Sequence, residues 1–426
     1  MERLKERFHF AHFCMIHMRS AGAIRRWQEK YLRRLIDYAG RNVPLWRRLL
    51  SERDITPGSI RSLTDLRNLP VTDKQTYIGL MPEEYVDSTQ LAGSYWHRTS
   101  GTSGTPFSFL STRRAYRAKY VDVSVLRFLW WLGEWSRRLS TIKIANIKIR
   151  AHQSAYRFFI SVKEFQTDPR KSLSEIVQFD PEIIASYPSM LLVLARVLAS
   201  DTTIRKPNPR FIISFGEMLS PSARAFIEAV IGGEIYNRYA LEEIGAIGLE
   251  CAQHDGFHIN SESVIVEILD ANGAPLESGK QGRVIVTDLF NYAMPFIRYD
   301  TGDHGVMSVE ECACGLRTPR IWIKGRYSAF LSFPSRAIHH LEFDGAMDGF
   351  MNDIVQYQIA KMSDAELRAR IVPGPTYRPA VNDSVKKELE KLVDAPIRVS
   401  VETVASITPA PRGKSRIVVD ESVPSV

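Results

Sequence analysis

Cysteines are few and long hydrophobic runs are missing, and each absence excludes a class of protein. The 426 residues contain only four cysteines, too few for a disulfide framework, so a reducing compartment is expected. No segment approaches the roughly 20 apolar residues that span a bilayer. The first 18 residues mix Arg, Lys and three histidines into their apolar stretch, which is unlike a signal-peptide core. The sequence therefore predicts a cytoplasmic protein.

Excess positive charge is also missing from most of the chain. The formal net charge is +8 at pH 7, and residues 1–50 account for all of it, with twelve basic and four acidic residues. The remaining residues carry 44 charges of each sign. A protein that coats nucleic acid spreads its basic residues over a binding face. No nucleic-acid partner is therefore expected.

Residues 8–18 form an unusual segment in which aromatic residues and histidines are interspersed. One interpretation is peripheral membrane contact through residues 1–22, or a metal site of His and Cys. The other interpretation is a helix that packs on the main domain. The apolar and histidine positions do not separate onto opposite helical faces, which favours packing.

Alternating elements indicate an α/β fold. Apolar residues at helical spacing predict a helix over residues 24–39. Between about 90 and 330, short apolar runs alternate with helical stretches, as in a strand at 211–215, a helix near 222–230 and a strand at 233–236. This alternation predicts a core of largely parallel strands. Later strands at 263–269 and 282–288, joined by an Asn272-Gly273 turn, add a β-rich portion.

The last hundred residues differ in character. A helix is predicted around 384–392, and strands are predicted at 397–401 and 416–419. Such a pattern is typical of a separate α+β unit, with its boundary near residue 326. We therefore expect two domains, residues 1–326 and 327–426, and the basic arm 1–50 belongs to the first.

The strongest local pattern is a run of hydroxyl residues and glycines at 98–106, Arg-Thr-Ser-Gly-Thr-Ser-Gly-Thr-Pro. Glycines let the backbone approach an anion closely, and its amides and the hydroxyls then donate hydrogen bonds. This chemistry suits phosphate, although composition alone fits a flexible loop equally well. The Gly-Lys-Ser/Thr ending of a P-loop is absent, which disfavours a P-loop ATPase. The phosphate-binding candidates are Thr99, Ser100, Gly101, Thr102, Ser103, Gly104 and Thr105.

Four further segments follow in chain order and extend this pattern. Tyr239–Glu243 can place a carboxylate beside a metal-bound phosphate, and Tyr299–Asp303 can present a carboxylate to ribose hydroxyls. Gly325-Arg326 lies at the expected domain boundary, and Pro411–Arg416 carries Lys414 on a glycine-containing loop. Each segment alone is common in surface turns, but the order and spacing of all four are hard to obtain by chance.

Together these segments resemble the adenylate-forming enzymes related to acyl-CoA synthetases and nonribosomal-peptide adenylation domains. The resemblance extends from about residue 30 to 420. The stretches Asn42–Leu50 and Leu69–Lys74 are most similar to the phenylacetate–coenzyme A ligase branch, including its capsule-biosynthesis (CapK-like) homologues. The implied fold is a large N-terminal α/β adenylate-forming domain with a β-rich subdomain, followed by a small mobile α+β domain.

The resemblance also implies roles for individual residues. Thr99–Thr105 would hold the β- and γ-phosphates of ATP. Gly216, Glu217 and Tyr239 would line the adenine and acyl pocket, and Glu243 would bind Mg²⁺.

The same resemblance assigns the chemistry of the α-phosphate. Asp303 and Arg326 would bind the ribose, and Lys414 would contact the α-phosphate and the substrate carboxylate. The catalytic residues would be Lys414, Glu243 and Arg326, because a cation and a metal stabilise the charge that develops when two anions meet.

Four positions depart from the family pattern. Phe107 stands where many relatives have Lys, Ala240 replaces Gly, Glu242 replaces Ser or Thr, and Ala329 occupies the position of a hinge aspartate. Two adjacent glutamates would repel a nucleotide unless Mg²⁺ or Arg neutralises them. An active, specialised enzyme is the first interpretation, and a nucleotide-binding homologue with altered or lost adenylation is the second.

Cysteine and histidine spacing forms a second pattern. Cys251 and His258 lie seven residues apart, and Cys312 and Cys314 follow about fifty residues later. Three thiolates and one imidazole suit tetrahedral Zn²⁺. The alternative is three unrelated buried cysteines, and His254 competes as the imidazole ligand. Capsule-type relatives show a similar set, which the resemblance extends to this chain as a structural zinc site.

The residues and the resemblance together predict an ATP- and Mg²⁺-dependent ligase. It would convert a small-molecule carboxylic acid, an aromatic acid being one candidate, into an acyl-adenylate with release of pyrophosphate. The acyl group would then pass to coenzyme A or another thiol. The alternatives are transfer to an amine, a hydroxyl or a carrier protein, and a nucleotide-binding homologue that serves a biosynthetic complex.

Overall fold

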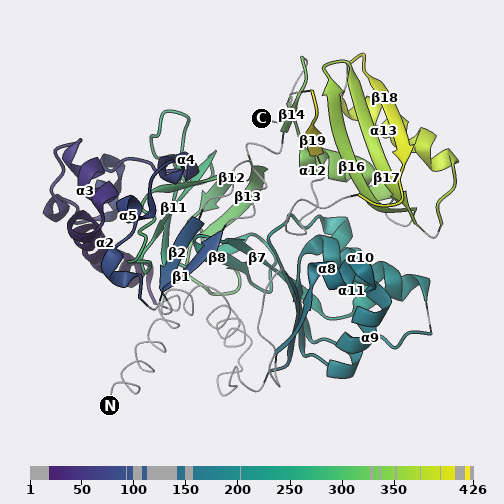
Figure 1. The fold of residues 1–426 in the computed structure, drawn as a ribbon, viewed down its shortest axis with the longest axis horizontal. Coiled ribbons are helices and arrows are strands. Elements are labelled where there is room, and N and C mark those ends of the chain that lie inside the picture. The colour runs from purple at the N-terminus through teal and green to yellow at the C-terminus, as the bar shows by residue number, and fades with distance from the viewer. Residues whose placement is uncertain are drawn as a thin grey trace. The chain divides into compact units, whose positions relative to one another are not determined.

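The computed structural model divides the chain into two compact units. Unit 1 consists of Met1–Thr141 and Tyr236–Lys324, and unit 2 consists of Ile142–Ile235 and Gly325–Val426. Figure 1 traces the chain from its purple N-terminal part to its yellow C-terminal part. The structure describes residues 19–92, 94–98, 108–112, 142–148, 157–201, 203–326, 330–334, 337–350, 353–374, 376–393, 395–407 and 418–422.

Unit 1 begins with helices that pack on its strands. Helix α2 (Ala21–Asn42) is capped by the side chain of Ser20 and buries the apolar residues of the helix predicted over 24–39, which is confirmed. Pro44 then opens α3 (Pro44–Ser51). Shorter helices follow: η2 (Pro57–Ser59), η3 (Leu63–Asn68), α4 (Lys74–Tyr77), α5 (Pro82–Tyr85) and η4 (Ser88–Gln90). No helix within the described stretches is long and apolar enough to cross a membrane.

The strands of unit 1 pair antiparallel, which differs from the largely parallel core predicted from the sequence. The pairs β7–β8, β8–β9, β9–β13, β10–β11 and β11–β12 are all antiparallel. Connections between several of them are too short for the crossover that a parallel pair requires. The strands are β1 (Ser94–Arg98), β2 (Ser108–Thr112), β7 (Glu234–Leu241), β8 (Gly245–Glu250), β9 (Phe257–Ile259), β10 (Val264–Leu269), β11 (Gln281–Asp288), β12 (Tyr299–Ser308) and β13 (Arg320–Arg326).

The predicted turn at Asn272-Gly273 lies between β10 and β11, and Gly273 has a φ of +85°. The connection is longer than a two-residue hairpin. Asp270 accepts hydrogen bonds from the backbone N of Asn272 and of Ala274 at 2.9 and 2.8 Å, which closes a turn ahead of the β11 strand. The side chain of an aspartate commonly stabilises a turn in this way.

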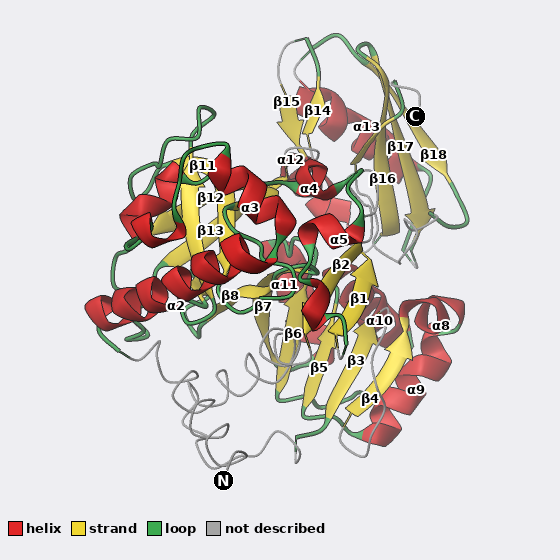
Figure 2. Ribbon diagram, turned by 60° about the vertical axis from the view of Figure 1, so that its left-hand side comes forward, coloured by secondary structure: helices red, strands yellow, loops and turns green. Residues whose placement is uncertain are grey.

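Unit 2 contains the parallel strands that the sequence predicted. Strand β3 pairs with β4 and β5, and β5 pairs with β6, all in parallel. Figure 2 shows helices α8, α9 and α10 beside these strands. The strands are β3 (Ile144–Lys148), β4 (Arg157–Ser161), β5 (Ile183–Ser186) and β6 (Phe211–Phe215), and the helices are α8 (Val162–Thr167), α9 (Pro169–Phe179), α10 (Pro188–Ser200) and α11 (Pro221–Ile231).

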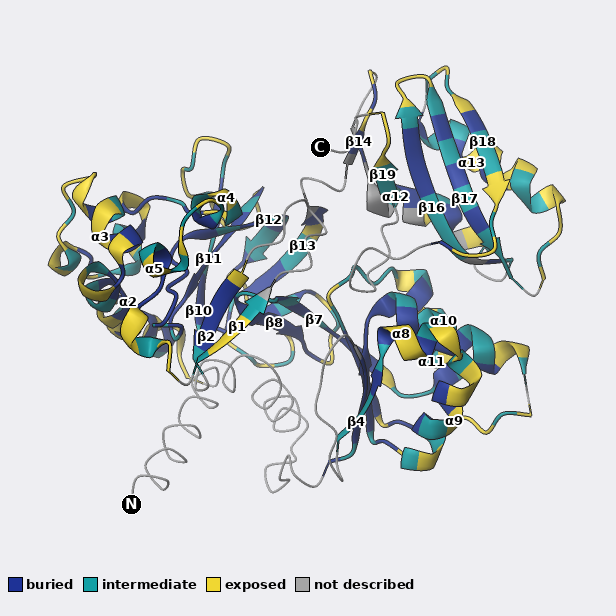
Figure 3. Ribbon diagram, in the orientation of Figure 1, coloured by how far each residue is buried: buried dark blue, intermediate teal, exposed yellow. Residues whose placement is uncertain are grey.

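The C-terminal segment of unit 2 is an α+β arrangement with its own core. Its four strands have the order β18-β17-β16-β19, and Figure 3 shows the buried residues along the central strands β16 and β17. The elements are β14 (Phe330–Ser332), β15 (Ala337–His339), α12 (His340–Met347), η7 (Asp348–Phe350), β16 (Ile354–Ser363), β17 (Glu366–Pro373), α13 (Ala380–Val393), β18 (Arg398–Thr403) and β19 (Val418–Asp420). The domain boundary between residues 326 and 327 stays a prediction.

Candidate active site and metal centre

Asp303, the residue predicted to bind ribose, is held by a tyrosine hydroxyl. Tyr239 lies in β7 and donates a hydrogen bond of 2.6 Å to Oδ2 of Asp303 in β12. Both residues are buried, with 9% and 4% of their surface exposed. A short hydrogen bond to a carboxylate is stronger than one between neutral groups. The Asp303 side chain therefore has a defined orientation.

Glu243, the predicted Mg²⁺ ligand, also accepts a hydrogen bond from a tyrosine hydroxyl. It follows β7, and its Oε1 accepts a hydrogen bond of 3.0 Å from the hydroxyl of Tyr299, the first residue of β12. The Tyr299 ring is buried and packs edge-on against Phe296 and beside Tyr77, with centroids 5.1 and 6.3 Å away. Close packing restricts the ring, so its hydroxyl is directed at Glu243.

A third carboxylate in the same region is neutralised by a cation. Asp300 accepts two hydrogen bonds from Arg283 of β11, from Nε at 3.0 Å and from Nη2 at 2.5 Å. Arginine pairs its charge with the carboxylate in this arrangement. The tyrosine hydroxyls that hold Asp303 and Glu243 add no positive charge. Carboxylate oxygens are the kind of acceptor that a cation or a polyhydroxyl ligand requires.

Arg298 fixes the start of the strand that carries Tyr299. The guanidinium donates to both carboxylate oxygens of Glu267 at 3.1 Å and to the carbonyl of Leu69 at 2.7 Å. Thr72 adds backbone hydrogen bonds of 3.0 and 2.7 Å to the residues on either side of Tyr299. The beginning of β12 is thus bound to the segment that precedes α4.

Gly216 and Glu217 lie in unit 2, directly after β6, and Gly216 has a φ of +77°. The two carboxylate oxygens of Glu217 accept from the backbone N and the hydroxyl of Ser189, each at 3.0 Å. Ser189 is in the first turn of α10, a helix whose own N-cap residue makes no side-chain capping hydrogen bond. Glu217 therefore caps that helix, and its predicted role in lining the adenine and acyl pocket stays a prediction.

Several predicted nucleotide-binding residues lie outside the described residues. These are Thr99–Thr105 and Lys414, and the family departures Phe107 and Ala329 are also outside. The strands that flank the first segment, β1 and β2, pair antiparallel with Arg98 opposite Ser108. Arg326 is described in its backbone as the last residue of β13.

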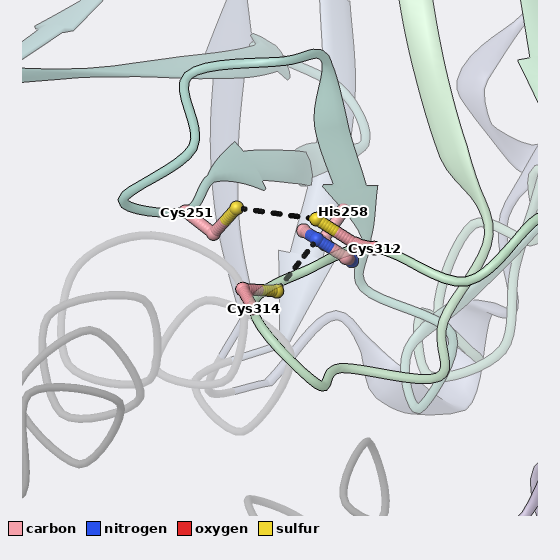
Figure 4. A group of neighbouring side chains, drawn as sticks. All are labelled: Cys251, His258, Cys312 and Cys314. Atoms are coloured by element: carbon pink, nitrogen blue, oxygen red, sulfur yellow. Dashed lines mark hydrogen bonds between the residues drawn. The ribbon is translucent and has the colours of Figure 1, made fainter.

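The three cysteines and the histidine of the predicted zinc site come together in unit 1 (Figure 4). Their ligand atoms all lie within 4.8 Å of one another. Sγ of Cys251 is 3.8 Å from Sγ of Cys312, and Sγ of Cys314 is 3.3 Å from Nε2 of His258. Sulfur ligands of a tetrahedral zinc ion lie roughly 3.8 Å apart, whereas disulfide sulfurs are only about 2 Å apart. The four side chains are thus grouped closely enough to hold a metal ion, and the two sulfurs of Cys251 and Cys312 are too far apart for a disulfide.

Local turns place these ligands. Cys251 directly follows β8, and His258 lies in the paired strand β9. Cys312 and Cys314 lie in the turn after β12, where the backbone N of Gly315 donates to the carbonyl of Cys312 at 2.9 Å and Gly315 has a φ of +82°. A positive φ favours glycine, so Gly315 lets the chain turn tightly around the two sulfurs.

The imidazole of His258 presents one nitrogen to the sulfurs and the other to a hydroxyl. Nδ1 lies 3.1 Å from Oγ1 of Thr318, which is the type of outer partner that orients metal-binding histidines. Burial lowers the pKa of His258 to about 4, so the ring is neutral at pH 7. Burial raises the pKa of the Cys251 thiol to about 12. His254, the competing ligand, instead lies with its Nδ1 3.2 Å from Glu250.

Sequence reasoning did not identify the residues that orient these groups. Tyr299 belongs to a segment that the sequence singles out, but spacing along the chain does not reveal where its hydroxyl points. Arg298 and Thr318 carry no motif. Their partners, Glu267 and His258, are 31 and 60 residues away in the sequence, so only the fold brings each pair together.

Comparisons with known proteins relate the chain to one group of enzymes. No protein-family model matches it. It is similar to a phenylacetate–coenzyme A ligase of Thermus thermophilus, with 26% identity over 366 residues that cover 82% of this chain and 81% of that protein. It is also similar to a phenylacetate–coenzyme A ligase of Pseudomonas putida, with 28% identity over 294 residues that cover 67% of this chain and 66% of that protein.

Solved structures share the fold. A 2-hydroxyisobutyryl-CoA ligase in the postadenylation state, in complex with R3-HIB-AMP, has a TM-score of 0.79 at 19% identity, and the match covers 95% of this chain and 91% of that chain. An open conformation of the ligase, in complex with 2-HIB-AMP and CoA, has a TM-score of 0.63 at 19% identity and covers 94% and 92%. The fold is therefore that of an adenylate-forming ligase. The chain is thus similar in sequence to phenylacetate–coenzyme A ligases, and it shares its fold with solved adenylate-forming ligases.

Proposed function

We propose that this protein uses ATP to activate a carboxylic acid and transfers the acyl group to coenzyme A. The observation that carries the proposal is the pair of carboxylates, Asp303 and Glu243, each oriented by a tyrosine hydroxyl on the adenylate-forming fold. Relatives named phenylacetate–coenzyme A ligases support the reaction class. An aromatic acid is accordingly the first substrate class to test.

The reaction has two half-reactions in this proposal. In the first, a carboxylate oxygen of the acid attacks the α-phosphorus of ATP, the bond to the β-phosphate breaks, and pyrophosphate leaves. In the second, the thiolate of coenzyme A attacks the acyl carbon, and AMP leaves. Both steps move negative charge near the α-phosphate, so groups that stabilise this charge accelerate them.

Each proposed binding residue has a task that follows from its chemistry. Asp303 accepts hydrogen bonds from the ribose hydroxyls, and Arg326 binds the ribose beside it. Backbone amides and hydroxyls of Thr99–Thr105 hold the β- and γ-phosphates. Lys414 brings an ammonium group to the α-phosphate and the substrate carboxylate, which reduces the repulsion between two anions. Gly216, Glu217 and Tyr239 line the adenine and acyl pocket.

The residues present fit a magnesium ion. Glu243 supplies a carboxylate, which is the hard oxygen ligand that Mg²⁺ prefers, and its hydrogen-bond donor Tyr299 is uncharged. Asp300, in contrast, has Arg283 as its counter-charge. When bound, the metal would neutralise phosphate charge and so favour departure of pyrophosphate. Glu242 is the neighbouring residue in the sequence and is also acidic.

We also propose a structural zinc ion at Cys251, His258, Cys312 and Cys314. The spacing of the four ligand atoms supports it, and so does the hydroxyl partner on the second nitrogen of His258. Four protein ligands complete a tetrahedron, so no position is open for a substrate. The site would tie the turn after β12 to the end of β8.

The remaining proposals concern the rest of the chain. Residues 327–426 are proposed to act as the small mobile domain that carries Lys414 to the α-phosphate. A cytoplasmic location is also proposed, and it agrees with the lack of a disulfide among the three described cysteines. The acceptor of the acyl group is proposed to be coenzyme A, with an amine, a hydroxyl or a carrier protein as outcomes that the acceptor assay distinguishes.

The test is exchange of labelled pyrophosphate into ATP in the presence of a panel of aromatic and aliphatic acids. Exchange that depends on one acid and on Mg²⁺ would support acyl-adenylate formation. The acid found in this way is then incubated with ATP and either coenzyme A, an amine or a carrier protein, and products are separated by chromatography. Absence of exchange with every acid would contradict the proposal and favour a nucleotide-binding homologue without catalysis.

A further inference from the structure

We propose that Tyr299 and Tyr239 are positioning residues for two different parts of a bound nucleotide. Tyr299 aims Glu243 at the metal that accompanies the phosphates, and Tyr239 aims Asp303 at the ribose. The proposal rests on the proposed function for the identity of the ligand, whereas the two hydrogen bonds are features of this chain alone. We call them the crossed tyrosine–carboxylate pairs.

In one hydrogen bond the donor lies in β7 and the acceptor in β12, and in the other the donor lies in β12 and the acceptor follows β7. Tyr239 of β7 donates to Asp303 of β12 at 2.6 Å, and Tyr299 at the start of β12 donates to Glu243, two residues beyond β7, at 3.0 Å. Strands β7 and β12 are not neighbours, because β8, β9 and β13 lie between them in the sheet. Asp303 in β12 is therefore oriented by a residue of β7, and Glu243, just after β7, is oriented by a residue of β12.

A tyrosine is suited to orient a carboxylate without cancelling its charge. An arginine in the same place would neutralise the group, as Arg283 does for Asp300 in the adjacent part of β12. A phenolic hydroxyl donates one hydrogen bond and leaves the carboxylate with further acceptor positions. Tyr239 and Tyr299 thus orient these two carboxylates through neutral donors, whereas Asp300 is held by a charged one.

The donors are held by packing before any ligand arrives. The Tyr299 ring is 2% exposed and packs against Phe296 and Tyr77, whose rings also contact each other. The Tyr239 ring is 9% exposed and lies beside Phe257, with centroids 6.1 Å apart. A donor with a fixed position orients its acceptor in advance, which lowers the cost of binding. Loss of either hydroxyl would leave its carboxylate with more rotational freedom.

The experiment replaces each tyrosine by phenylalanine, which removes only the hydroxyl. Binding of AMP in EDTA and of the non-hydrolysable ATP analogue AMP-PNP with Mg²⁺ is measured by calorimetry for each full-length variant. Tyr299→Phe is expected to weaken the magnesium-dependent binding by about tenfold and to leave AMP binding in EDTA unchanged. Tyr239→Phe is expected to weaken both by a similar factor, because both ligands contain the ribose.

Tyr77→Phe is the matched control. Tyr77 belongs to the same buried aromatic cluster, but its hydroxyl lies near a backbone carbonyl, that of Pro295, at 3.5 Å. This variant should bind both ligands as the unaltered protein does. Circular dichroism and the melting temperature check that each variant is folded.

The outcomes separate this inference from the proposed function. Equal losses for both ligands in Tyr299→Phe, or a loss no larger than in Tyr77→Phe, would overturn the positioning role. Selective losses in a protein that shows no pyrophosphate exchange would support the positioning role and contradict the proposed reaction. A protein that binds neither ligand would overturn both.

Discussion

Arg298 and Glu267 form a buried ion pair in which the guanidinium donates to both carboxylate oxygens at 3.1 Å. The Arg298 and Glu267 side chains are 3% and 15% exposed, and Arg298 adopts a φ of +47°, a region that non-glycine residues occupy infrequently. Burial raises the pKa of Glu267, and the positive charge of Arg298 opposes that rise. Burial of either charge alone would be unfavourable, so the charged state of Glu267 is stabilised by Arg298 and that of Arg298 by Glu267.

Replacing Arg298 by Met should destabilise the protein by about 3–5 kcal/mol at pH 7.5, because Glu267 remains as an uncompensated buried charge. Without Arg298 the folded-state pKa of Glu267 rises further above its unfolded value. A group with a raised pKa favours the folded state below the unfolded pKa, and this contribution is lost as the pH rises through the folded pKa. The stability deficit of the variant should therefore shrink between pH 7.5 and pH 5 in urea denaturation.

The control for this prediction is the double variant Arg298→Met with Glu267→Gln, which has no buried charge. It should recover much of the stability and lose the extra pH dependence. A deficit of the same size at both pH values in the single variant would show that the Glu267 charge is not its source.

The Cys–His cluster should bind about one zinc ion per chain, measured by elemental analysis of the purified protein. Cys312→Ser should reduce the content below about half an equivalent and lower the melting temperature, because a structural zinc ion contributes to folding. Cys14→Ser, which alters the one cysteine outside the cluster, should leave the content unchanged. Equal zinc content in both variants would rule out the proposed ligand set.

Thr318→Val should lower zinc affinity by about tenfold without abolishing binding. The hydroxyl fixes the orientation of the His258 ring, and loss of such an outer partner typically costs 10- to 100-fold in metal affinity. Competition with a colorimetric chelator measures the change. Thr318→Ser retains the hydroxyl and is expected to behave as the unaltered protein, so a similar loss in the serine variant would point to packing instead of the hydrogen bond.

Lys414→Ala should reduce acid-dependent pyrophosphate exchange by about 100-fold or more, because the variant lacks the cation that stabilises developing charge. Nucleotide affinity measured by calorimetry should change little. Lys391→Ala, on the exposed side of α13, is the control for removal of a positive charge from the same C-terminal region. Unchanged exchange in Lys414→Ala would remove this residue from the proposed mechanism.

Deleting residues 1–18 should leave pyrophosphate exchange within about twofold of the full chain. Helix α2 keeps its cap at Ser20 and its hydrogen bonds from Trp27 and Gln28 to backbone carbonyls of unit 1 at 3.0 and 2.9 Å, so the scaffold is retained. Sedimentation with anionic vesicles tests the membrane interpretation of this segment. Vesicle binding by the full chain that disappears on deletion would favour that interpretation over packing.

Much of the local structure is predictable from the sequence because it depends on short-range periodicity. The strand at 211–215 coincides with β6, and the helix near 222–230 lies within α11. Apolar residues at period two or 3.6 indicate which face is buried. Strand direction is less predictable, since it depends on the connections. The parallel arrangement holds for β3 to β6 and fails for the strands from β7 to β13.

The candidate site also has a part that the sequence predicts and a part that it does not. Asp303, Glu243 and the four Cys and His residues stand in recognisable segments, so the sequence indicates them. The sequence does not indicate the partners that orient these residues, because a hydrogen bond such as that from Tyr299 to Glu243 joins residues 56 positions apart. Similarly, the use of Glu217 as a cap for α10 follows from the approach of two distant segments.

The sequence by itself determined the superfamily resemblance, the main helices and strands, and the residue types available for nucleotide and metal binding, because motifs and periodicity act over short distances. Only the tertiary structure decided that Tyr239 meets Asp303, that Tyr299 meets Glu243, and that Cys251 lies 3.8 Å from Cys312. These contacts depend on how β8, β9 and β13 separate β7 from β12 and on turns closed by glycines such as Gly315. Hydrogen bonds and metal ligation act over a few ångströms, so their partners are set by packing and not by order along the chain.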